Sequence, residues 1–339
     1  MTPSSVLIVS TVHWVGDPRL NRHREYLTTA GHEVCLVSHR GAPRWLALAR
    51  TLKDIARSKS SVVILPDPEL YFLGSVVARL TGKRPVPDIH EDYPRAAMAR
   101  PWVPGWARPL VRVLAAFATW LGRLAAWRVM VAAPELARRG DLVVLNVPDP
   151  LSLQPVAPDG SHRLVYIGDV TLARGALAMV ETLGHLDESF VLEVIGNVSP
   201  GVASRIESAA EGLGVRSRVE LIGRLEHSEA WKRAGGALAG LNLLAAVPAY
   251  MEAVATKLWE YMAIGLPVVV SDLPGQSRVV SQIHADLVCP TPVEAADVIR
   301  RLADDPELRR TLGEQARRLV EEKWEASRPD RVVQSLLDP

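Results

Sequence analysis

The sequence has 339 residues, more than a single domain usually contains, so it predicts two domains that each bury a core. Hydrophobic residues make up 48% and charged residues 23%, and the net charge is +1, which excludes the basic excess of a nucleic-acid-binding protein. Two distant cysteines in strand-like runs argue against a disulfide framework or a zinc site and suggest a reducing cytoplasm. The N-terminus reads as a first strand, not a signal peptide, and no apolar run approaches the roughly 20 residues that span a bilayer.

The first half of the chain alternates between strand and helix patterns. Asp17 and Pro18 are typical of a helix start, and Gly31 of a helix end. The alternation predicts a parallel sheet with helices on both faces. We expect strands at 6–9, 32–38, 62–65, 85–89, 129–133 and 142–145, and further helices at 45–57 and 70–80.

The second half repeats this alternation after a proline-rich stretch. Proline denies residues 151–162 helix or central strand, so these residues are the expected linker. The predicted fold class is therefore α/β, with two doubly wound Rossmann-like domains facing each other across a cleft: 1–150, the N-terminal domain, and 163–320, followed by a C-terminal helix at 321–339. The second domain's expected strands are 164–167, 191–195, 219–222, 238–243 and 268–270.

The segment 250–275 combines two carboxylates, a helix and a buried strand. Gly265 and Pro267 end the helix before the strand. If Glu252 lies at the start of the helix and Glu260 two turns along, about 12 Å of helical rise separates them and both can line one cleft. Such carboxylates could hold two sets of vicinal hydroxyls on one elongated ligand. The alternative is a solvated helix face with a weak Lys257–Glu260 pair, and the spacing alone favours that alternative.

The same segment resembles the Glu-x7-Glu motif of retaining glycosyltransferases with the GT-B architecture, family 4 (glycosyltransferase group 1) in particular. The resemblance implies that Glu252 contacts hydroxyls of the donor sugar and Glu260 the ribose of the nucleotide. It also implies that the C-terminal helix crosses back to the first domain, and that the first domain is the acceptor side. The matching residues are Glu252, Glu260, Ala263, Gly265, Pro267, Val268 and Val269.

Two segments of the first domain extend the resemblance: Asp-Pro-Glu-Leu at 67–70, and Asp-x-His-Glu-Asp at 88–92. His90 follows a strand and is expected to point toward the cleft. There, a neutral imidazole could donate a hydrogen bond to the transferring sugar or orient the acceptor hydroxyl. The alternative is a histidine bonded to a nearby carboxylate. The chain departs from the subgroup at Pro66, where a histidine is usual.

Two loops are candidates for binding the donor diphosphate. Gly16 follows the first strand, where backbone amides and a helix N-terminus can bind an anion, and in the family this loop usually has two glycines. In the second domain, Arg174 stands in place of the family's lysine, whereas Asp169 replaces its arginine. A cationic clamp is most useful for the charge on the leaving nucleoside diphosphate. Arg174 is expected to supply it alone or with Lys257.

Tryptophans and arginines interleave in the segment 101–130. An interfacial helix on an anionic membrane would meet a lipid-linked acceptor. The alternative is two ordinary helices that cover the first sheet with arginines pointing outward, and the shortness of the apolar run favours it. The residues concerned are Trp102, Trp106, Trp120 and Trp127, with Arg108, Arg112, Arg123 and Arg128.

These observations predict a metal-independent retaining glycosyltransferase. Its donor is a UDP-, GDP- or dTDP-sugar, and its acceptor hydroxyl belongs to a small molecule, glycan or lipid-linked molecule in polysaccharide, glycolipid or natural-product glycoside synthesis. No metal or further cofactor is expected, since an Asp-x-Asp motif is missing. The setting is cytoplasmic, with the inner face of the membrane as one option. Two alternatives are a GT-B-like sugar-nucleotide 2-epimerase and a sugar-nucleotide-binding partner subunit, the latter suggested by Asp169 and the single glycine at Gly16.

Overall fold

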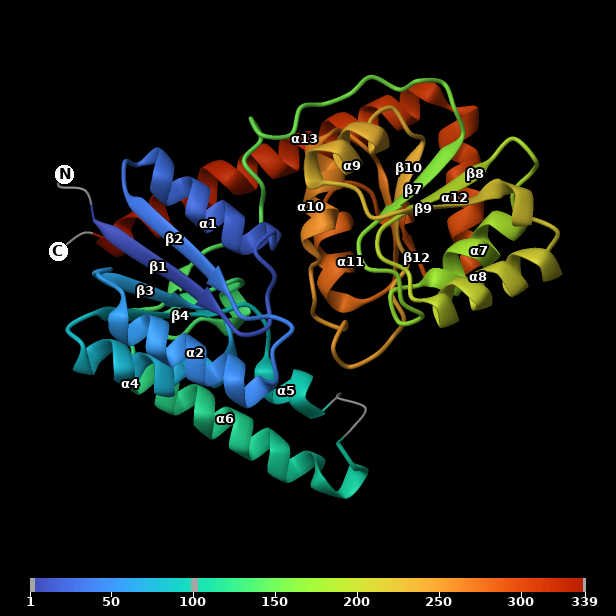
Figure 1. Cartoon of the computed structure of the whole chain (residues 1–339). Coiled ribbons are helices and arrows are strands. Elements are labelled where there is room, and N and C mark those ends of the chain that lie inside the picture. The colour runs from blue at the N-terminus through green and yellow to red at the C-terminus, as the bar shows by residue number, and fades with distance from the viewer. Residues whose placement is uncertain (1–3, 99–102, 338–339) are drawn as a thin grey trace. The chain divides into compact units, whose positions relative to one another are not determined.

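The computed structural model describes residues 4–98 and 103–337. The chain forms two compact units: unit 1 comprises Met1–Asn146 and Ala326–Pro339, and unit 2 comprises Val147–Glu325. Each unit contains one six-stranded parallel sheet with helices packed on it (Figure 1). The predicted pair of doubly wound α/β domains is therefore confirmed.

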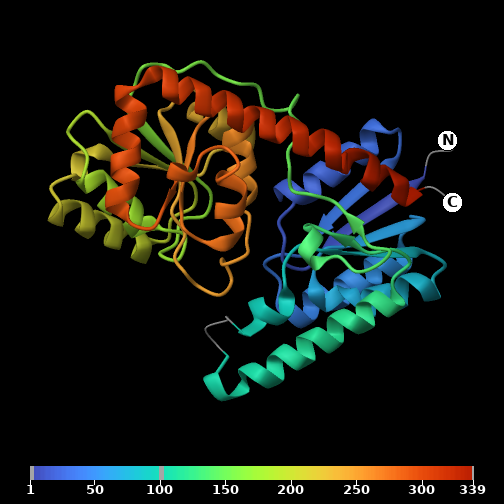
Figure 2. The ribbon, with the colours of Figure 1, turned by 180° about the vertical axis from the view of Figure 1, so that it is seen from behind.

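Unit 1 has the strand order β2-β1-β3-β4-β5-β6. Its strands β1 and β3 are almost entirely buried, because α1 and α14 cover one face of the sheet while α2, α4 and α6 cover the other (Figures 1 and 2). The order reverses between β1 and β3, and ligands of such sheets bind at the carboxyl ends of strands at this switch point. The elements are β1 Ser5–Ser10, α1 Pro18–Thr29, β2 Glu33–Ser38, α2 Arg44–Arg57, β3 Val62–Leu65, α3 Pro68–Tyr71, α4 Leu73–Leu80, β4 Arg84–Ile89, α5 Tyr93–Met98, α6 Arg108–Ala125, β5 Met130–Val131, β6 Leu142–Val143 and α14 Pro329–Gln334.

Unit 2 has the strand order β12-β11-β10-β7-β8-β9. Its switch point lies between β7 and β10, where the loops after the two strands leave in opposite directions along the sheet. The elements are β7 Arg163–Ile167, α7 Ala176–Gly184, β8 Val191–Ile195, α8 Pro200–Gly212, β9 Val219–Gly223, α9 His227–Ala234, β10 Ala239–Asn242, α10 Thr256–Ala263, β11 Val268–Ser271, α11 Pro274–Val280, β12 Val288–Cys289, α12 Pro292–Asp304 and α13 Pro306–Ser327, the last of which reaches the unit boundary.

Residues 151–162, the expected linker, cluster with unit 2 in the structure. The backbone N–H of Val156 donates to the carbonyl of Ile264 at 3.3 Å, and that of Asp159 to Gly236 at 3.0 Å. These bonds attach the proline-rich stretch to unit 2, so the boundary between the units falls earlier, between Asn146 and Val147. The final helical stretch is also interrupted: α13 ends before Arg328, whose φ of 36° is left-handed, and Pro329 then begins α14.

Helix α10 is shorter than the sequence predicts, and Glu252 is not at its start. The helix begins at Thr256, because the preceding loop is held against the first turn of α11. Gly275 donates from its N–H to the carbonyl of Met251 at 2.8 Å, and a Cβ at Gly275 would lie 2.4 Å from the Glu252 carbonyl carbon. The expected two turns of helix between Glu252 and Glu260 are therefore wrong, and Glu252 belongs to a loop.

Candidate functional site

Lys257 and Arg174 lie near each other at the switch point of unit 2. Lys257 is in the first turn of α10, and Arg174 is in the loop between β7 and α7. The Lys257 Nζ atom lies 3.5 Å from the centroid of the Tyr166 ring, a cation–π contact at the end of β7. Gly168 has a φ of 134°, and a Cβ there would lie 3.3 Å from Nζ, so the glycine leaves space for the ammonium group.

The Lys257 ammonium lacks a full set of partners. Burial holds the pKa of Lys257 well below its usual value, and the charge of Arg174 lowers this pKa further, while Asp169 and Glu260 act in the opposite direction. Among the described residues, Nζ is buried without a hydrogen-bond partner. A bound anion would supply the missing acceptor and favour the charged form of this lysine.

Arg174 is oriented by its neighbours in unit 2. Its Nη1 lies 3.6 Å from Asp169 Oδ2, and its side chain hydrogen-bonds to Tyr250. Burial lowers the pKa of Arg174, but the Tyr250 hydrogen bond and the nearby negative groups outweigh it, so the pKa is raised. Asp169, at the position where the family has a basic residue, is exposed and partly neutralises Arg174.

The two acidic residues of the Glu-x7-Glu motif have different surroundings. Glu260 is buried on α10, and its Oε1 lies 3.0 Å from the Nε2 of His227. The indole N–H of Trp231 lies 3.1 Å from the same His227 nitrogen, so a His227 Nε2 that donates to Glu260 cannot also accept from Trp231. Glu252 is half-exposed, and its Oε2 accepts a hydrogen bond of 2.8 Å from Arg278. The two carboxylates are thus held by separate partners, Glu260 in the interior and Glu252 at the surface.

Sequence reasoning missed His227 and Trp231. They lie on α9, 33 and 29 residues before Glu260, and nothing in their local pattern indicates that α9 packs beside α10. The Trp231 ring meets the Tyr261 ring edge-on, with centroids 5.0 Å apart. Tyr261 in turn accepts from the Ile167 N–H at 2.8 Å, which ties α10 to the end of β7.

In unit 1, His90 follows β4, as the sequence predicts, and is neutral. Burial lowers its pKa to about 4. Its Nδ1 lies 3.2 Å from the Asp88 carbonyl oxygen, and its Nε2 lies 3.0 Å from the Tyr93 hydroxyl. Both ring nitrogens therefore have partners within unit 1, and these partners fix the orientation of the imidazole.

A second histidine, His13, accompanies His90 at the switch point of unit 1. The two rings meet edge-on with centroids 5.1 Å apart. The Nδ1 of His13 lies 3.0 Å from Asp17 and its Nε2 3.4 Å from Asp67. Burial lowers the pKa of His13, but the Asp17 hydrogen bond and the surrounding carboxylates outweigh this effect and raise it. A histidine with a raised pKa thus lies beside the neutral His90, and local sequence patterns gave no sign of this pairing.

Gly16 lies in the loop between β1 and α1. A Cβ at this position would lie 2.1 Å from the Trp14 ring, so the lack of a side chain has a packing reason in the structure. Asp17 caps α1 by accepting from the N–H groups of Arg19 and Leu20, as the sequence predicts. Gly16 therefore contributes to the shape of a short turn, and its contact with a phosphate stays a prediction.

Below His90, a buried ion pair connects β4 to α1. The guanidinium of Arg19 donates to both carboxylate oxygens of Asp88, at 2.8 and 2.6 Å. The Nε2 of His23 lies 3.1 Å from Asp88 as well. Burial raises the pKa of Asp88, but the charge of Arg19 and the His23 hydrogen bond outweigh it and hold this pKa well below its usual range.

From residue 103 to residue 125, the chain forms a short 3-10 turn and one long helix, α6, which packs on the unit 1 sheet, so one helix covers the sheet where two were expected; Trp102 lies outside the described residues. Gly122 packs against Tyr71, where a Cβ would approach to 2.5 Å, and this contact fixes the covered face of α6. The opposite face is an apolar stripe, with Phe117 stacked on Trp120 at 5.6 Å. No described helix is long and apolar enough to cross a membrane. The stripe consists of Leu110, Val113, Leu114, Phe117 and Leu124, each 54–63% exposed, and Trp120.

Comparisons with known proteins agree with this architecture. The family model for glycosyl transferases group 1 matches residues 153–319. Alpha-D-kanosaminyltransferase from Streptomyces kanamyceticus is 27% identical over 177 residues, which cover 50% of this chain and 43% of that protein. This chain spans less than half the length of the curated relatives it matches.

Solved structures resemble the whole chain. The sucrose-phosphate synthase of Thermosynechococcus elongatus superimposes with a TM-score of 0.75 at 17% identity, covering 98% of this chain and 97% of that one. HepE from Anabaena, solved in complex with UDP, gives a TM-score of 0.70 at 12% identity and covers 98% of this chain and 99% of that one. These likenesses show the GT-B fold. Residues 153–319 are therefore a domain of the glycosyl transferases group 1 type.

Proposed function

We propose that the protein transfers a sugar with retention, and without a metal ion, from a nucleoside-diphosphate sugar to an acceptor hydroxyl. The observation that carries this proposal is the buried Lys257 Nζ, which lacks a hydrogen-bond partner among the described residues and lies near Arg174 at the switch point of unit 2. The group 1 domain at residues 153–319 supports it, and the UDP bound to the Anabaena neighbour supports a UDP-, GDP- or dTDP-sugar as the donor.

Each residue has a role that follows from its surroundings. Lys257 and Arg174 bind the diphosphate and stabilise the charge that it gains as the sugar departs. Glu260, buried and oriented by His227, accepts hydrogen bonds from the ribose hydroxyls. Glu252, at the surface, contacts the hydroxyls of the sugar after parting from Arg278.

Unit 1 carries the residues proposed to serve the acceptor. His90, neutral and held by Tyr93, orients the acceptor hydroxyl, and the Gly16 loop contacts the donor phosphates. The acceptor is a small molecule, a glycan or a lipid-linked molecule, and the reaction takes place in the cytoplasm.

The two acidic residues predict separable effects. Glu260→Ala is expected to weaken binding of the preferred nucleoside diphosphate by about tenfold or more, because charge-assisted hydrogen bonds to the ribose are lost. Glu252→Ala is expected to leave that affinity nearly unchanged and to lower turnover, because its contacts are to the sugar. Glu181→Ala, an exposed glutamate on α7, is the matched control. Calorimetric titration and donor turnover give the two readouts, and equal, negligible effects of both variants would remove the assignment.

One experiment separates the proposal from its two alternatives. Saturation-transfer NMR identifies which of UDP, GDP and dTDP binds, and the matching sugar nucleotide is then incubated with the protein. Transfer to an acceptor, or slow hydrolysis that releases the sugar with its C2 configuration unchanged, supports a transferase. A 2-epimerase would release free nucleoside diphosphate without transfer to any acceptor and with a sugar inverted at C2, and binding without turnover would indicate a partner subunit.

We further propose that α6 lies on the anionic inner face of a membrane. An exposed apolar stripe of this size is unusual on a protein surface without a function. Residues 93–134 contain six arginines and no acidic residue, which is the charge that such a surface attracts. This contact would bring unit 1 to a lipid-linked acceptor.

The membrane proposal predicts a specific loss of binding to vesicles. Phe117→Asp is expected to lower the affinity for vesicles containing phosphatidylglycerol by about tenfold, since one aromatic side chain no longer enters the interface. Trp45→Asp is the control, because Trp45 is an even more exposed aromatic of unit 1, 72% against 54% for Phe117, and lies on α2. Co-sedimentation measures both. Equal loss in the two variants, or equal binding to uncharged vesicles, would contradict the proposal.

A further inference from the structure

A cavity of about 380 Å³ lies at the edge of the unit 2 sheet opposite the candidate site. Ala237 and Pro267, which line it, lie just before β10 and β11, whereas Arg174 and Lys257 lie in the segments that follow β7 and β10. Its volume is within the range of small-molecule sites in proteins. The cavity is therefore distinct from the proposed donor site and lies within one unit.

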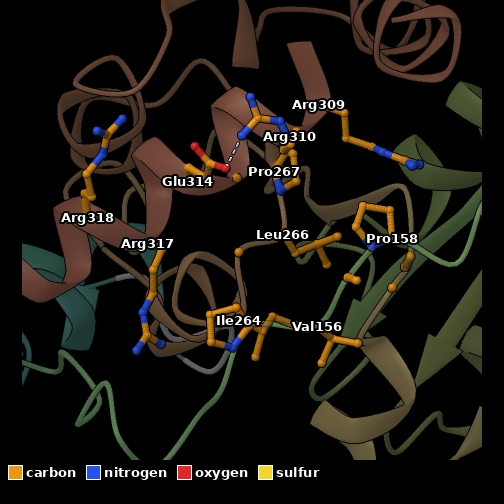
Figure 3. Close-up of a pocket in the computed structure, with 16 residues that line it drawn as sticks. Val156, Pro158, Ile264, Leu266, Pro267, Arg309, Arg310, Glu314, Arg317 and Arg318 are labelled. Atoms are coloured by element: carbon orange, nitrogen blue, oxygen red, sulfur yellow. Dashed lines mark hydrogen bonds and ion pairs between the residues drawn. The ribbon is translucent and has the colours of Figure 1, made fainter. Parts of the chain in front are cut away.

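The floor of the cavity is apolar. Val156 and Pro158 come from the proline-rich stretch that is bonded to unit 2, and Ile264 and Leu266 come from the turn between α10 and β11 (Figure 3). Gly313 of α13 packs directly on this turn, since a Cβ there would lie 2.2 Å from the Gly265 carbonyl oxygen. The close approach of α13 to the turn forms one wall of the cavity and places the side chains of α13 at its rim.

That wall carries four arginines, and the side chains of Arg310 and Arg317 are bonded to neighbouring groups. Arg310 pairs with Glu307 and Glu314, and Figure 3 shows the contact with Glu314. Arg317 donates to the carbonyls of Pro150, Leu153 and Ala263, and pairs with Glu321. The guanidinium groups of Arg310 and Arg317 are therefore occupied by contacts within unit 2.

Arg309 differs from these two. Its Nε is buried, and no acceptor among the described residues lies within hydrogen-bond distance of it. In Figure 3, its side chain extends on the same side as Pro158, whereas that of Arg318 extends the other way. A buried, unbonded guanidinium N–H costs free energy unless an acceptor reaches it.

We propose that this cavity binds an anionic amphiphile, a small molecule with an apolar body and one phosphate or carboxylate head. The body contacts Val156 and Leu266, and the head accepts hydrogen bonds from Arg309. The mostly apolar lining favours a ligand with an apolar body, and the Arg309 Nε–H without an acceptor favours an anionic head. Because the lining includes the turn that joins α10 to β11, an occupant would contact the segment that directly follows the helix carrying Lys257 and Glu260.

Calorimetric titration of the full chain with four probes tests the proposal. Octyl phosphate and octanoate carry both features, octyl glucoside has the body without the charge, and inorganic phosphate has the charge without the body. We expect saturable binding of octyl phosphate, at least tenfold tighter than that of octyl glucoside or inorganic phosphate. Octanoate distinguishes a carboxylate site from a phosphate site: comparable binding supports both heads, and weaker binding restricts the head to phosphate.

Variants place the binding in the cavity. Arg309→Gln is expected to weaken octyl phosphate binding about tenfold, and Val156→Asp to weaken it by repulsion, whereas Arg205→Gln, an exposed arginine on α8 outside the cavity, should have no effect. Circular dichroism and thermal unfolding check that each variant is folded. Unchanged octyl phosphate binding in both cavity variants, or equal affinity for octyl glucoside, would overturn the proposal.

Discussion

Replacing Lys257 with methionine is expected to lower turnover of the donor by about 10²–10³-fold, the usual effect of removing one group that stabilises a developing negative charge. Methionine keeps most of the apolar stem on the Tyr166 ring, so the variant should fold. Lys232→Met is the control, because Lys232 is an exposed lysine of α9 in the same unit. Activity within twofold of the wild type in Lys257→Met would contradict the role of this lysine.

The same lysine predicts a direction for the pH dependence of nucleotide binding. In the free protein, burial and Arg174 hold the pKa of Lys257 well below its usual value. A bound diphosphate favours the ammonium form and raises this pKa, so binding takes up a proton at any pH between the two values. Affinity is therefore greatest below the free-state pKa and falls as the pH rises toward the bound-state pKa.

Calorimetry in two buffers of different ionisation enthalpy measures this proton uptake. We expect it in the wild type and in Lys232→Met, and we expect its loss in Lys257→Met. This readout reports on binding alone, so it tests the assignment of Lys257 even when the preferred acceptor is missing. Equal proton uptake in all three proteins would assign the proton to another group.

The fold was readable from sequence because its central strands are buried on both faces. Runs such as Val268–Ser271 are β-branched and uncharged, and such runs cannot lie at a solvated surface. Errors occurred where a tertiary contact overrides the local pattern. The packing of Gly275 on the Glu252 backbone delays the start of α10, and no local preference of the residues around 252–255 indicates it.

The candidate site was predictable only in part for the same reason. Glu260, Lys257 and Arg174 lie in or near recognisable motifs. The partners that set their environments are distant in the sequence. His227 orients Glu260 from another helix, and the pairing of His13 with His90 joins loops after two different strands. Pairings of this kind depend on the order of strands in the sheet, which a strand pattern does not specify.

The largest effect on stability is expected for Asp88→Ala. This change leaves the Arg19 guanidinium buried without its carboxylate partner, and breaking one side of a buried ion pair costs about 3–5 kcal/mol. The local free energy of opening, measured by hydrogen exchange of the amides in β1, β3 and β4, should fall in unit 1. Amides of unit 2 should change little. Asp297→Ala, which removes an exposed pair with Arg300, is the control and should leave both units unchanged.

A double replacement distinguishes the loss of the pair from a general sensitivity of this position. Arg19→Met with Asp88→Leu removes both charges and leaves no unpaired ion, so it should be more stable than Asp88→Ala by several kcal/mol. The expected pH dependence has the same cause. Because the pKa of Asp88 is lowered in the folded protein, its contribution to the free energy of unfolding is present above the pKa of the unfolded state and is lost as the pH falls through the pKa of the folded state. Asp88→Ala should therefore show a weaker acid dependence of unit 1 stability than the wild type. If the double variant were no more stable than Asp88→Ala, the cost would come from lost packing, and the ion pair would not be what holds α1 on β4.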